Sequence, residues 1–383
     1  MKDASLLMNN QAYDVAVVGS GAAGLTAACV AASMGQKVVV IEQSPYVGGT
    51  SAISGGMLWI PGHPYLAQNG LKDSPQNVRQ YLENFIAKPF DARMEAFLAH
   101  CSPALQYLEK HTHLRTRPVT GYPDYYSELD GASIGCRVLE PEPFDGKLLG
   151  KHFHLLRAPL PEFMVFGGMM VSRQDIPLLR KARQGKSLTA VFNAASLVFE
   201  YLTQRIFHPR GTRLYLGNAL VARLFKSALD LNIDFLLNAS AKEIIFDSGN
   251  ITGIIVKEDN NDKKINVAKG VILATGGLSH DHTLRNQYFS EIDSFKSATI
   301  SRGDSLSGAK IAMMANAKIS DNGKNGVFGV PLSHYVRPDG SEVYYPHTVT
   351  DRSKPGLIAV NAVGRRFTNE ARSYHDFYYS QLE

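Results

Sequence analysis

Residues 13–24 read YDVAVVGSGAAG, a short β-branched run that leads straight into a glycine-rich turn. Such a run is typical of a buried strand, and the small apolar residues after the turn, as far as Met34, predict a closely packed helix. A second β-branched run, KVVVI at residues 37–41, comes after Gly35 and ends at Glu42. The sequence therefore predicts a βαβ unit, in which two parallel strands belong to a sheet covered by helices on both faces.

The glycines of this turn are spaced as Gly19-x-Gly21-x-x-Gly24, between the predicted strand and helix. The first permits a tight turn, the second lets the backbone approach a pyrophosphate, and the third allows close helix–sheet packing. The pyrophosphate then lies at the helix N-terminus, where N–H groups and the helix dipole favour an anion. Glu42, at the end of the second strand, can accept hydrogen bonds from ribose hydroxyls. The unit predicts dinucleotide binding but does not by itself distinguish FAD from NAD.

A second glycine-rich segment, GGTSAISGG at residues 48–56, favours FAD. Its glycines would let the main chain press against a flat ring system, and its three hydroxyls would donate hydrogen bonds. A flexible linker is disfavoured because apolar residues 57–60 follow at once, and ATGG at 274–277 gives a third close-approach point at the end of a later strand. The residues expected to contact FAD are Gly19, Ser20, Gly21, Ala22, Ala23, Gly24, Glu42, Gln43, Gly49, Thr50, Ser51, Ser54, Gly55, Gly56, Met57, Ala241, Ala274, Thr275, Gly276 and Gly277.

The rest of the chain interrupts the α/β pattern and then resumes it. The predicted fold class is α/β: a Rossmann-like FAD-binding domain over residues 1–315, with a helical and irregular insertion at about 61–211. The beginning of an α+β catalytic domain follows at 316–383. Apolar periodicity predicts helices at 77–86, 93–111, 187–206 and 216–231, a strand at 233–237, a hairpin within 243–257 and a buried strand at 270–275.

Composition excludes several classes of protein. The 383 residues carry 40 Lys+Arg against 35 Asp+Glu, a net charge of +5 without a basic run, so nucleic-acid binding is not expected. The three cysteines, Cys29, Cys101 and Cys136, form no CxxC pair, which fits a reducing cytoplasm rather than a disulfide framework. The uncharged stretch 15–35 is explained by the strand, turn and helix, and MKDASLLMNN at residues 1–10 has no signal-peptide core, so no membrane span is expected.

Histidines two positions apart could chelate a metal from a strand, and they occur at 111/113, 152/154 and 280/282. No cysteine or acidic cluster accompanies any of these pairs in the sequence. No metal site is therefore expected.

The chain resembles the fumarate reductase/3-ketosteroid dehydrogenase family of FAD-dependent oxidoreductases, in particular its 3-oxosteroid 1-dehydrogenase branch. The resemblance covers the chain from residue 13 onward and implies a Rossmann-like FAD domain interrupted by a catalytic domain. The segments that carry it are VVGSGAAG at 17, EQSPYVGGTSAISGGMLWIPG at 42, GYPDYYSE at 121, EPEPFDG at 140, FGGMMVSR at 166, RGTRLYLGNALVARL at 210, ATGG at 274 and KPGLIAVNAVGRRFTNEARSYHDF at 354.

The resemblance implies a dehydrogenation beside the ketone of a hydrophobic, steroid-like substrate, with a proton removed by a base, a hydride passed to the flavin, and an electron acceptor of unknown identity. It implies that the base is Tyr374 in NEARSYHDF. A phenol is a poor base at neutral pH, so a second tyrosine is expected to assist it. The resemblance offers Tyr125 or Tyr126 for that role, and the sequence does not choose between them.

Two alternatives stay open at this stage. Arg365, Arg366 and Arg372 could clamp a small unsaturated acid, as fumarate-reducing relatives do, although the apolar residues 163–166 and Tyr344-Tyr345 suit a larger apolar substrate. The second alternative is an inactive fragment. The family's glycine- and proline-rich C-terminal segment, which holds the flavin ring, has no counterpart here, so the chain is expected to be C-terminally short.

Overall fold

The computed structural model describes residues 12–86, 90–172, 175–185, 187–259, 261–288, 296–301, 303, 306–319 and 328–382. The N-terminal stretch in which no signal-peptide core is expected lies outside these ranges. Among the described residues, every helix is too short or too polar to cross a bilayer.

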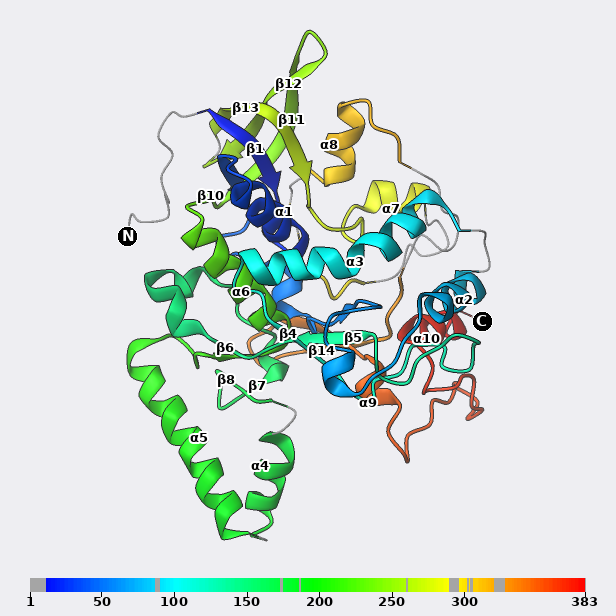
Figure 1. Ribbon diagram of the computed structural model, residues 1–383. Helices are drawn as coiled ribbons and strands as arrows, with labels where there is room; N and C mark the ends of the chain where they lie inside the picture. The colour runs from blue at the N-terminus through cyan, green and yellow to red at the C-terminus, as the bar shows by residue number, and fades with distance from the viewer. Residues whose placement is uncertain are drawn as a thin grey trace.

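A six-stranded sheet lies in the upper part of the molecule as drawn in Figure 1. Its parallel part consists of β10 (Asp234–Leu236), β2 (Val38–Ile41), β1 (Tyr13–Val18) and the second half of β13 (Asn261–Leu273). Val18 is in register with both Ile41 and Leu273. Because the carboxyl ends of parallel strands meet at one edge, the residues that follow these strands emerge side by side. In spatial order the strands are β10 (Asp234–Leu236), β2 (Val38–Ile41), β1 (Tyr13–Val18), β13 (Asn261–Leu273), β12 (Asn250–Glu258) and β11 (Ala239–Asp247).

Side chains of β1 alternate between two core layers, as the pleat of a strand requires. Val17 belongs to the core formed with the first two covering helices, whereas Val18 belongs to a second core, formed with the antiparallel strands and Ile311. Both faces of the sheet are therefore covered, as the sequence predicts for parallel strands. The covering helices are α1 (Ala22–Ser33) and α6 (Leu216–Asp230) on one face and α8 (Gly308–Met314) on the other.

The predicted α/β fold class is confirmed, and so are its local elements. The βαβ unit is β1–α1–β2, and the predicted hairpin is β11–β12, which turns at Ser248-Gly249. The helices expected at 77–86, 93–111, 187–206 and 216–231 are α2 (Pro75–Ile86), α3 (Ala92–His111), α5 (Leu188–Phe207) and α6, with ends that differ by at most two residues.

The strand expected at 270–275 differs from the prediction in length and burial. β13 begins at Asn261, because its first half pairs with β12 and extends the hairpin into a three-stranded meander. The expectation of full burial is wrong: Ile272 is 39% exposed, although its neighbours Val271 and Leu273 pack against the second core. Adjacent side chains of a strand face opposite sides, and only one side of β13 is well covered here.

The described residues of the inserted region form small strands and four α-helices. Two of its helices, α4 (Asp175–Arg183) and α5 (Leu188–Phe207), pack together and extend away from the sheet as a hairpin (Figure 1). The helices are α2 (Pro75–Ile86), α3 (Ala92–His111), α4 (Asp175–Arg183) and α5 (Leu188–Phe207), and the paired strands are β3 (Leu58–Trp59) and β4 (Thr116–Pro118) with β5 (Val138–Pro141), β6 (Phe144–Asp145) with β9 (Arg213–Leu214), and β7 (Met164–Val165) with β8 (Met169–Met170).

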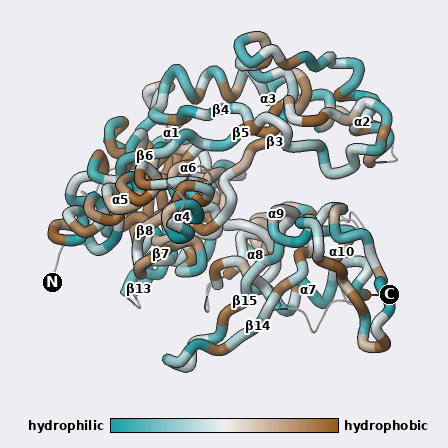
Figure 2. Tube along the Cα trace, turned by 90° about the horizontal axis from the view of Figure 1, so that it is seen from below, coloured by the Kyte–Doolittle hydropathy of each residue, from teal (hydrophilic) through white to brown (hydrophobic). Residues whose placement is uncertain are grey.

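The C-terminal residues form a separate group of elements. Figure 2 shows β14 (Leu332–Val336), β15 (Glu342–Pro346), α9 (Val349–Arg352) and α10 (Tyr374–Ser380) together on one side of the molecule, and α2 and α3 on the other. The division near residue 315 stays a prediction. The α-helices and strands described after residue 315 are β14, β15, α9 and α10, whereas α7 (His282–Tyr288) comes before α8.

Candidate functional site

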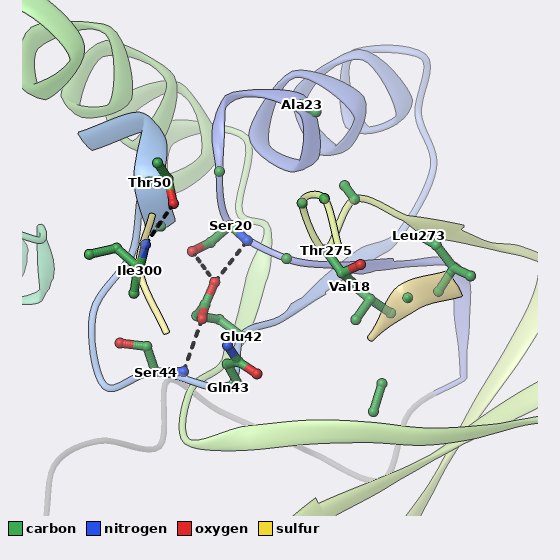
Figure 3. A pocket seen from close by; sticks show the side chains of 18 of the residues that line it. Val18, Ser20, Ala23, Glu42, Gln43, Ser44, Thr50, Leu273, Thr275 and Ile300 are labelled. Carbon is green, nitrogen blue, oxygen red and sulfur yellow. Dashed lines mark hydrogen bonds between the residues drawn. The ribbon is translucent and has the colours of Figure 1, made fainter. Parts of the chain in front are cut away.

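A cavity of about 650 Å³ opens at the carboxyl edge of the sheet, where β1, β2 and β13 end (Figure 3). Most of the residues predicted to contact a cofactor line it. They are Gly19, Ser20, Gly21, Ala22, Ala23, Glu42, Gln43, Gly49, Thr50, Ser51, Ala241, Ala274, Thr275, Gly276 and Gly277. The described lining does not include Gly24, Ser54, Gly55, Gly56 or Met57.

Two glycines of the turn occupy positions that no other residue fits. Gly19 has a φ of +105°, and a Cβ there would lie 2.4 Å from the carbonyl oxygen of Ala274. A Cβ at Gly24 would lie 1.9 Å from the carbonyl oxygen of Gly19. Gly24 therefore does not touch the cavity but lets α1 approach the turn, which is the packing role expected of the third glycine.

The N-terminus of α1 points its backbone donors at the cavity. Gly21 is the N-cap residue and has no side chain to cap the helix, and the first turn carries no acidic residue. The Ala22 N–H donates to Ser51 Oγ at 3.0 Å. The remaining N–H groups of the first turn, together with the helix dipole, favour an anionic ligand at this end of the helix.

Glu42 is a buried carboxylate at the end of β2, and Figure 3 shows it between Ser20 and Ser44. One oxygen accepts from the Ser20 N–H at 2.9 Å and the Ser20 hydroxyl at 2.6 Å, and the other accepts from the Ser44 N–H at 2.9 Å. These bonds fix the carboxylate in one orientation. A carboxylate can accept about four hydrogen bonds in all, so capacity is left for a ribose hydroxyl.

The second glycine-rich segment has a mixed role. Thr50 lines the cavity and its Oγ1 accepts from the Ile300 N–H at 3.1 Å. Ser54 instead stabilises the segment itself: its hydroxyl donates to the Ser51 carbonyl at 2.8 Å and accepts from the Gly56 N–H at 3.1 Å. A Cβ at Gly56 would lie 2.6 Å from the Gly217 nitrogen, so this glycine allows close packing on α6. The end of the segment thus packs against the fold while its beginning faces the cavity.

Tyr125 and Tyr374, which are 249 positions apart, lie in contact. Their ring centroids are 5.6 Å apart and the rings are nearly perpendicular, at 76°. Burial of the hydroxyl, and next the adjacent Tyr374, raise the pKa of Tyr125 far above the ordinary value for tyrosine. Tyr126 points elsewhere: its hydroxyl donates to Asp376 at 2.8 Å, and burial together with that carboxylate raises its pKa to about 12. The structure therefore brings one of the two candidate tyrosines to Tyr374.

Beside Tyr125 lies a second, smaller cavity of about 250 Å³ with mostly apolar walls. Met57, predicted as a cofactor contact, lies on this wall instead. A buried ion cluster supports the wall: the Arg137 guanidinium binds Asp73 at 2.8 Å and Asp124 at 2.7 Å. The residues that line this apolar pocket are Met57, Leu58, Trp59, Tyr81, Leu82, Phe85, Tyr122, Pro123, Asp124, Tyr125 and Val138.

Comparison with known proteins assigns the chain to a family. A family model described as an FAD binding domain matches residues 14–382. The chain belongs to this FAD-binding family. The predicted FAD cofactor and the predicted family are thereby confirmed.

Among curated members of the family, 4-oxocyclohex-2-ene-1-carboxylate 5-dehydrogenase of Sinomonas cyclohexanicum is 33% identical over 371 residues, which are 96% of this chain and 62% of that protein. The 3-oxosteroid 1-dehydrogenase of Mycolicibacterium smegmatis is 31% identical over 96% of this chain and 63% of its own length. The solved 3-ketosteroid delta1-dehydrogenase from Sterolibacterium denitrificans, in complex with 1,4-androstadiene-3,17-dione, superposes with a TM-score of 0.84 at 29% identity and covers 98% of this chain and 66% of that one. The chain thus spans just under two thirds of the length of these relatives.

The polar and charged groups that line the larger cavity match those that FAD, the cofactor of this family, requires. The glycine backbone and the α1 N-terminus would hold a pyrophosphate, and Glu42 would accept a hydrogen bond from a ribose. Arg157 adds a cation: it lines the cavity, its Nη2 donates to Ser44 Oγ at 2.6 Å, and within the described chain its buried Nε has no hydrogen-bond partner. Burial lowers the pKa of this guanidinium, while the nearby Glu42 opposes that shift. An anionic cofactor would satisfy the unpaired group.

Sequence reasoning missed Arg157 and the residues from the far side of the cavity. Arg157 follows a stretch with no periodicity or motif that would distinguish it from a surface cation. Gly308, at the start of α8, packs so closely that a Cβ would lie 2.0 Å from Thr275 Oγ1. The other lining residues missed are Val18, Ile41, Ser44, Ala239, Ser240, Leu273, Ser279, His280, Thr299, Ile300, Leu306, Ala309, Ile311 and Ala312.

Two histidines from the pairs noted in the sequence, His280 and His113, lie next to different partners. His280 lies at the cavity with Nε2 3.0 Å from the Thr299 carbonyl, and His113 Nε2 lies 2.6 Å from the Asp230 carboxylate. Within the described ranges, no three His, Cys, Asp or Glu side chains converge as a metal site would require.

Proposed function

We propose that the protein uses FAD to remove two hydrogens from adjacent carbons beside the ketone of a cyclic, 3-oxosteroid-like substrate. One leaves as a proton from the carbon α to the carbonyl, which acidifies it, and the other leaves with its electron pair from the neighbouring carbon. When bound, FAD supplies the acceptor of that hydride. The observation that carries the proposal is the contact of Tyr125 with Tyr374 beside an apolar pocket.

In this proposal Tyr374 is the base that accepts the α proton. A phenol titrates near pH ~10, so a tyrosine base needs stabilisation of its anionic form. Tyr125 is suited to give it, because its raised pKa keeps its O–H protonated at neutral pH and available to donate to the oxygen of Tyr374. Tyr126 is not assigned a role in proton transfer, because its hydroxyl already donates to Asp376.

The predicted domain organisation is consistent with these two roles, of Tyr374 as the base and Tyr125 as its hydrogen-bond donor. The insertion at about 61–211 provides Tyr125, and the part from 316 onward provides Tyr374. We propose that the catalytic site forms where these two parts meet, next to a FAD-binding domain that extends to about residue 315. Met57 is suited to link the two cavities, because it follows directly on the glycine-rich segment of the larger one and lies on the wall of the apolar one.

The apolar pocket favours a ring-shaped ketone as substrate. Its walls are aromatic and aliphatic, with Asp124 engaged by Arg137 rather than by a ligand. The apolar residues noted in the sequence also meet, since the Phe163 and Tyr345 rings lie 6.3 Å apart. The named relatives act on a 3-oxosteroid and on an oxocyclohexene carboxylate, which share a cyclic ketone. We infer that this ketone ring is the recognised element and that the electron acceptor is a separate molecule.

A fumarate-type reaction has less support from the arginines. Arg366 forms an ion pair with Glu370 at 2.5 Å, and Arg372 lies 3.3 Å from Glu128. These guanidiniums already hold carboxylates of the chain itself. A clamp for a small dicarboxylic acid would have to displace them.

The compartment proposed for this reaction is the cytoplasm. Cys29, Cys101 and Cys136 are all buried and unpaired, as in proteins of reducing compartments. Burial raises the pKa of the Cys29 thiol to about 12, which keeps it protonated and unreactive.

The experiment is turnover of 4-androstene-3,17-dione by the FAD-loaded protein with an artificial electron acceptor. Tyr374→Phe should lower the rate by roughly 10²–10⁴-fold, the usual contribution of a general base. Tyr125→Phe should lower it by a smaller factor and shift the pH profile upward. Tyr126→Phe is the matched control and should stay within about threefold of the wild type. Unchanged turnover in Tyr374→Phe would refute the assignment.

A further inference from the structure

Helix α5 carries an apolar stripe on the side opposite to the one that packs against the protein. The stripe consists of Leu188, Phe192, Phe199, Leu202 and Ile206, which recur along the helix with Ala195 at intervals of four, three, four, three and four residues. Residues at these intervals share one face of a helix. The packed face instead contains the buried Ala190, Tyr201 and Gln204.

The members of the stripe are exposed to an unusual degree. Leu188 is 89% exposed, Phe192 74%, Phe199 69% and Ile206 73%. The 20-residue helix is about 30 Å long, and the stripe runs along its whole length. Single exposed apolar residues are normal, but a continuous row of this kind marks an interaction surface.

The charges around the stripe decide between its possible partners. The segment from Asp175 to Phe207 contains five basic residues, Arg180, Lys181, Arg183, Lys186 and Arg205, against two acidic ones, Asp175 and Glu200, which leaves a net charge of +3. In the described part of the chain, no carboxylate forms an ion pair with Arg180, Lys181 or Arg183. A second copy of this hairpin would bring the same positive charge against it, whereas an anionic bilayer is complementary to it.

We propose that the α4–α5 hairpin docks onto the surface of an anionic phospholipid bilayer. The apolar stripe enters the boundary between headgroups and acyl chains, and the basic end of α4 binds the headgroup phosphates. This is the arrangement of an interfacial amphipathic helix, which lies on a membrane without spanning it. The hairpin projects away from the six-stranded sheet (Figure 1), and none of its described residues lines the cavity at the carboxyl edge of that sheet. The proposal does not depend on the reaction proposed above.

Flotation with vesicles tests this. The whole protein should float with phosphatidylcholine vesicles that contain phosphatidylglycerol, and much less with phosphatidylcholine alone. Phe192→Ser/Phe199→Ser should lower the ratio of bound to free protein more than tenfold, and Arg180→Glu/Lys181→Glu/Arg183→Glu should lower it comparably on the anionic vesicles. The matched control is Ile358→Ser/Val363→Ser, which removes two apolar side chains that are 66% and 76% exposed elsewhere and should float like the wild type.

Two further measurements, fluorescence and sedimentation, distinguish docking on a bilayer from coverage of the stripe by protein. The fluorescence of Phe199→Trp should shift to the blue and be quenched by brominated lipid only when anionic vesicles are present. A Trp at position 199 that is already shielded from acrylamide without lipid would mean that protein covers the stripe, and the proposal would be wrong. A wild type that stays with the free protein would also overturn it. So would a dimer in sedimentation that Phe192→Ser/Phe199→Ser converts to a monomer, because the occupant would then be a second copy.

Discussion

Replacement of Arg137 tests how the apolar pocket is held in place. The Arg137 side chain is 1% exposed, and its partners Asp73 and Asp124 are 3% and 1% exposed. The guanidinium also donates to the Gly131 carbonyl at 2.8 Å, while Asp124 accepts from the Trp59 indole at 2.7 Å. Arg137→Met would remove the only guanidinium described in this cluster and leave two buried carboxylates facing each other.

The expected cost is large. Removal of one partner from a buried ion pair destabilises a protein by about 3–5 kcal/mol, because a charge is left uncompensated. With an unfolding entropy of about 2.1 cal/mol/K for each residue, a chain of 383 residues loses roughly 1.2 °C for each kcal/mol, so the melting temperature should fall by about 4–6 °C. Because Trp59, Tyr81 and Asp124 line the apolar pocket, turnover should fall with stability.

Thermal denaturation of three variants measures this. Arg117→Met is the matched control, because the Arg117–Glu140 pair joins the same small sheet but its arginine is 39% exposed, and the change should cost about 1 kcal/mol or less. Arg137→Met/Asp73→Asn/Asp124→Asn should recover part of the loss, since the neutral amides carry no unpaired charge. If Arg137→Met melts like Arg117→Met, the reasoning about the buried charges is refuted.

Three further outcomes are expected. Gly24→Ala should lower the amount of FAD that stays bound after gel filtration more than tenfold, as measured by flavin absorbance, because the added Cβ would meet the Gly19 carbonyl. The control is Gly55→Ala, because a Cβ at Gly55 meets nothing within 4 Å. An equal loss of FAD in both variants would contradict the packing argument. Arg157→Gln should weaken FAD binding in a flavin titration by about 10–100-fold, which is the contribution of a charge-assisted hydrogen bond. The control is Arg180→Gln, which changes an exposed arginine. If Arg157→Gln binds FAD as tightly as the wild type, Arg157 is not part of the cofactor site. Arg366 and the Ala359 N–H lower the pKa of Glu370 to about 2, so the folded pKa lies below the unfolded one. The resulting stability is present above pH ~4.5 and is lost as the pH falls through about 2. The difference in melting temperature between the wild type and Glu370→Gln should shrink over that range, and a constant difference would argue against the ion pair.

The nucleotide-binding half of the fold was predictable because its determinants are local. A strand, a turn with glycines at fixed spacing, a helix and a terminal carboxylate lie within 30 residues, from Tyr13 to Glu42, and each has a strong conformational preference. The structure has these elements within one residue of their predicted bounds, and Gly24 has the predicted packing role.

Features that depend on distant contacts were not predictable in the same way. Tyr125 and Tyr126 are neighbours in the chain, and only the position of α10 directs one toward Tyr374 and the other toward Asp376. Arg157 reaches the cavity from a region without periodicity. The stripe on α5 has the spacing of an ordinary core-facing helix, and periodicity cannot tell whether anything covers it.

The central claim is tested most directly by mixing the FAD-loaded protein with 4-androstene-3,17-dione in the absence of oxygen and of any other electron acceptor, and following the flavin absorbance. We predict that the oxidised flavin band bleaches as the substrate is dehydrogenated, and that Tyr374→Phe slows the bleaching at least a hundredfold while it leaves the FAD content unchanged. A band that stays unbleached with this steroid, and also with 4-oxocyclohexanecarboxylate, in protein that holds a full complement of FAD would contradict the account.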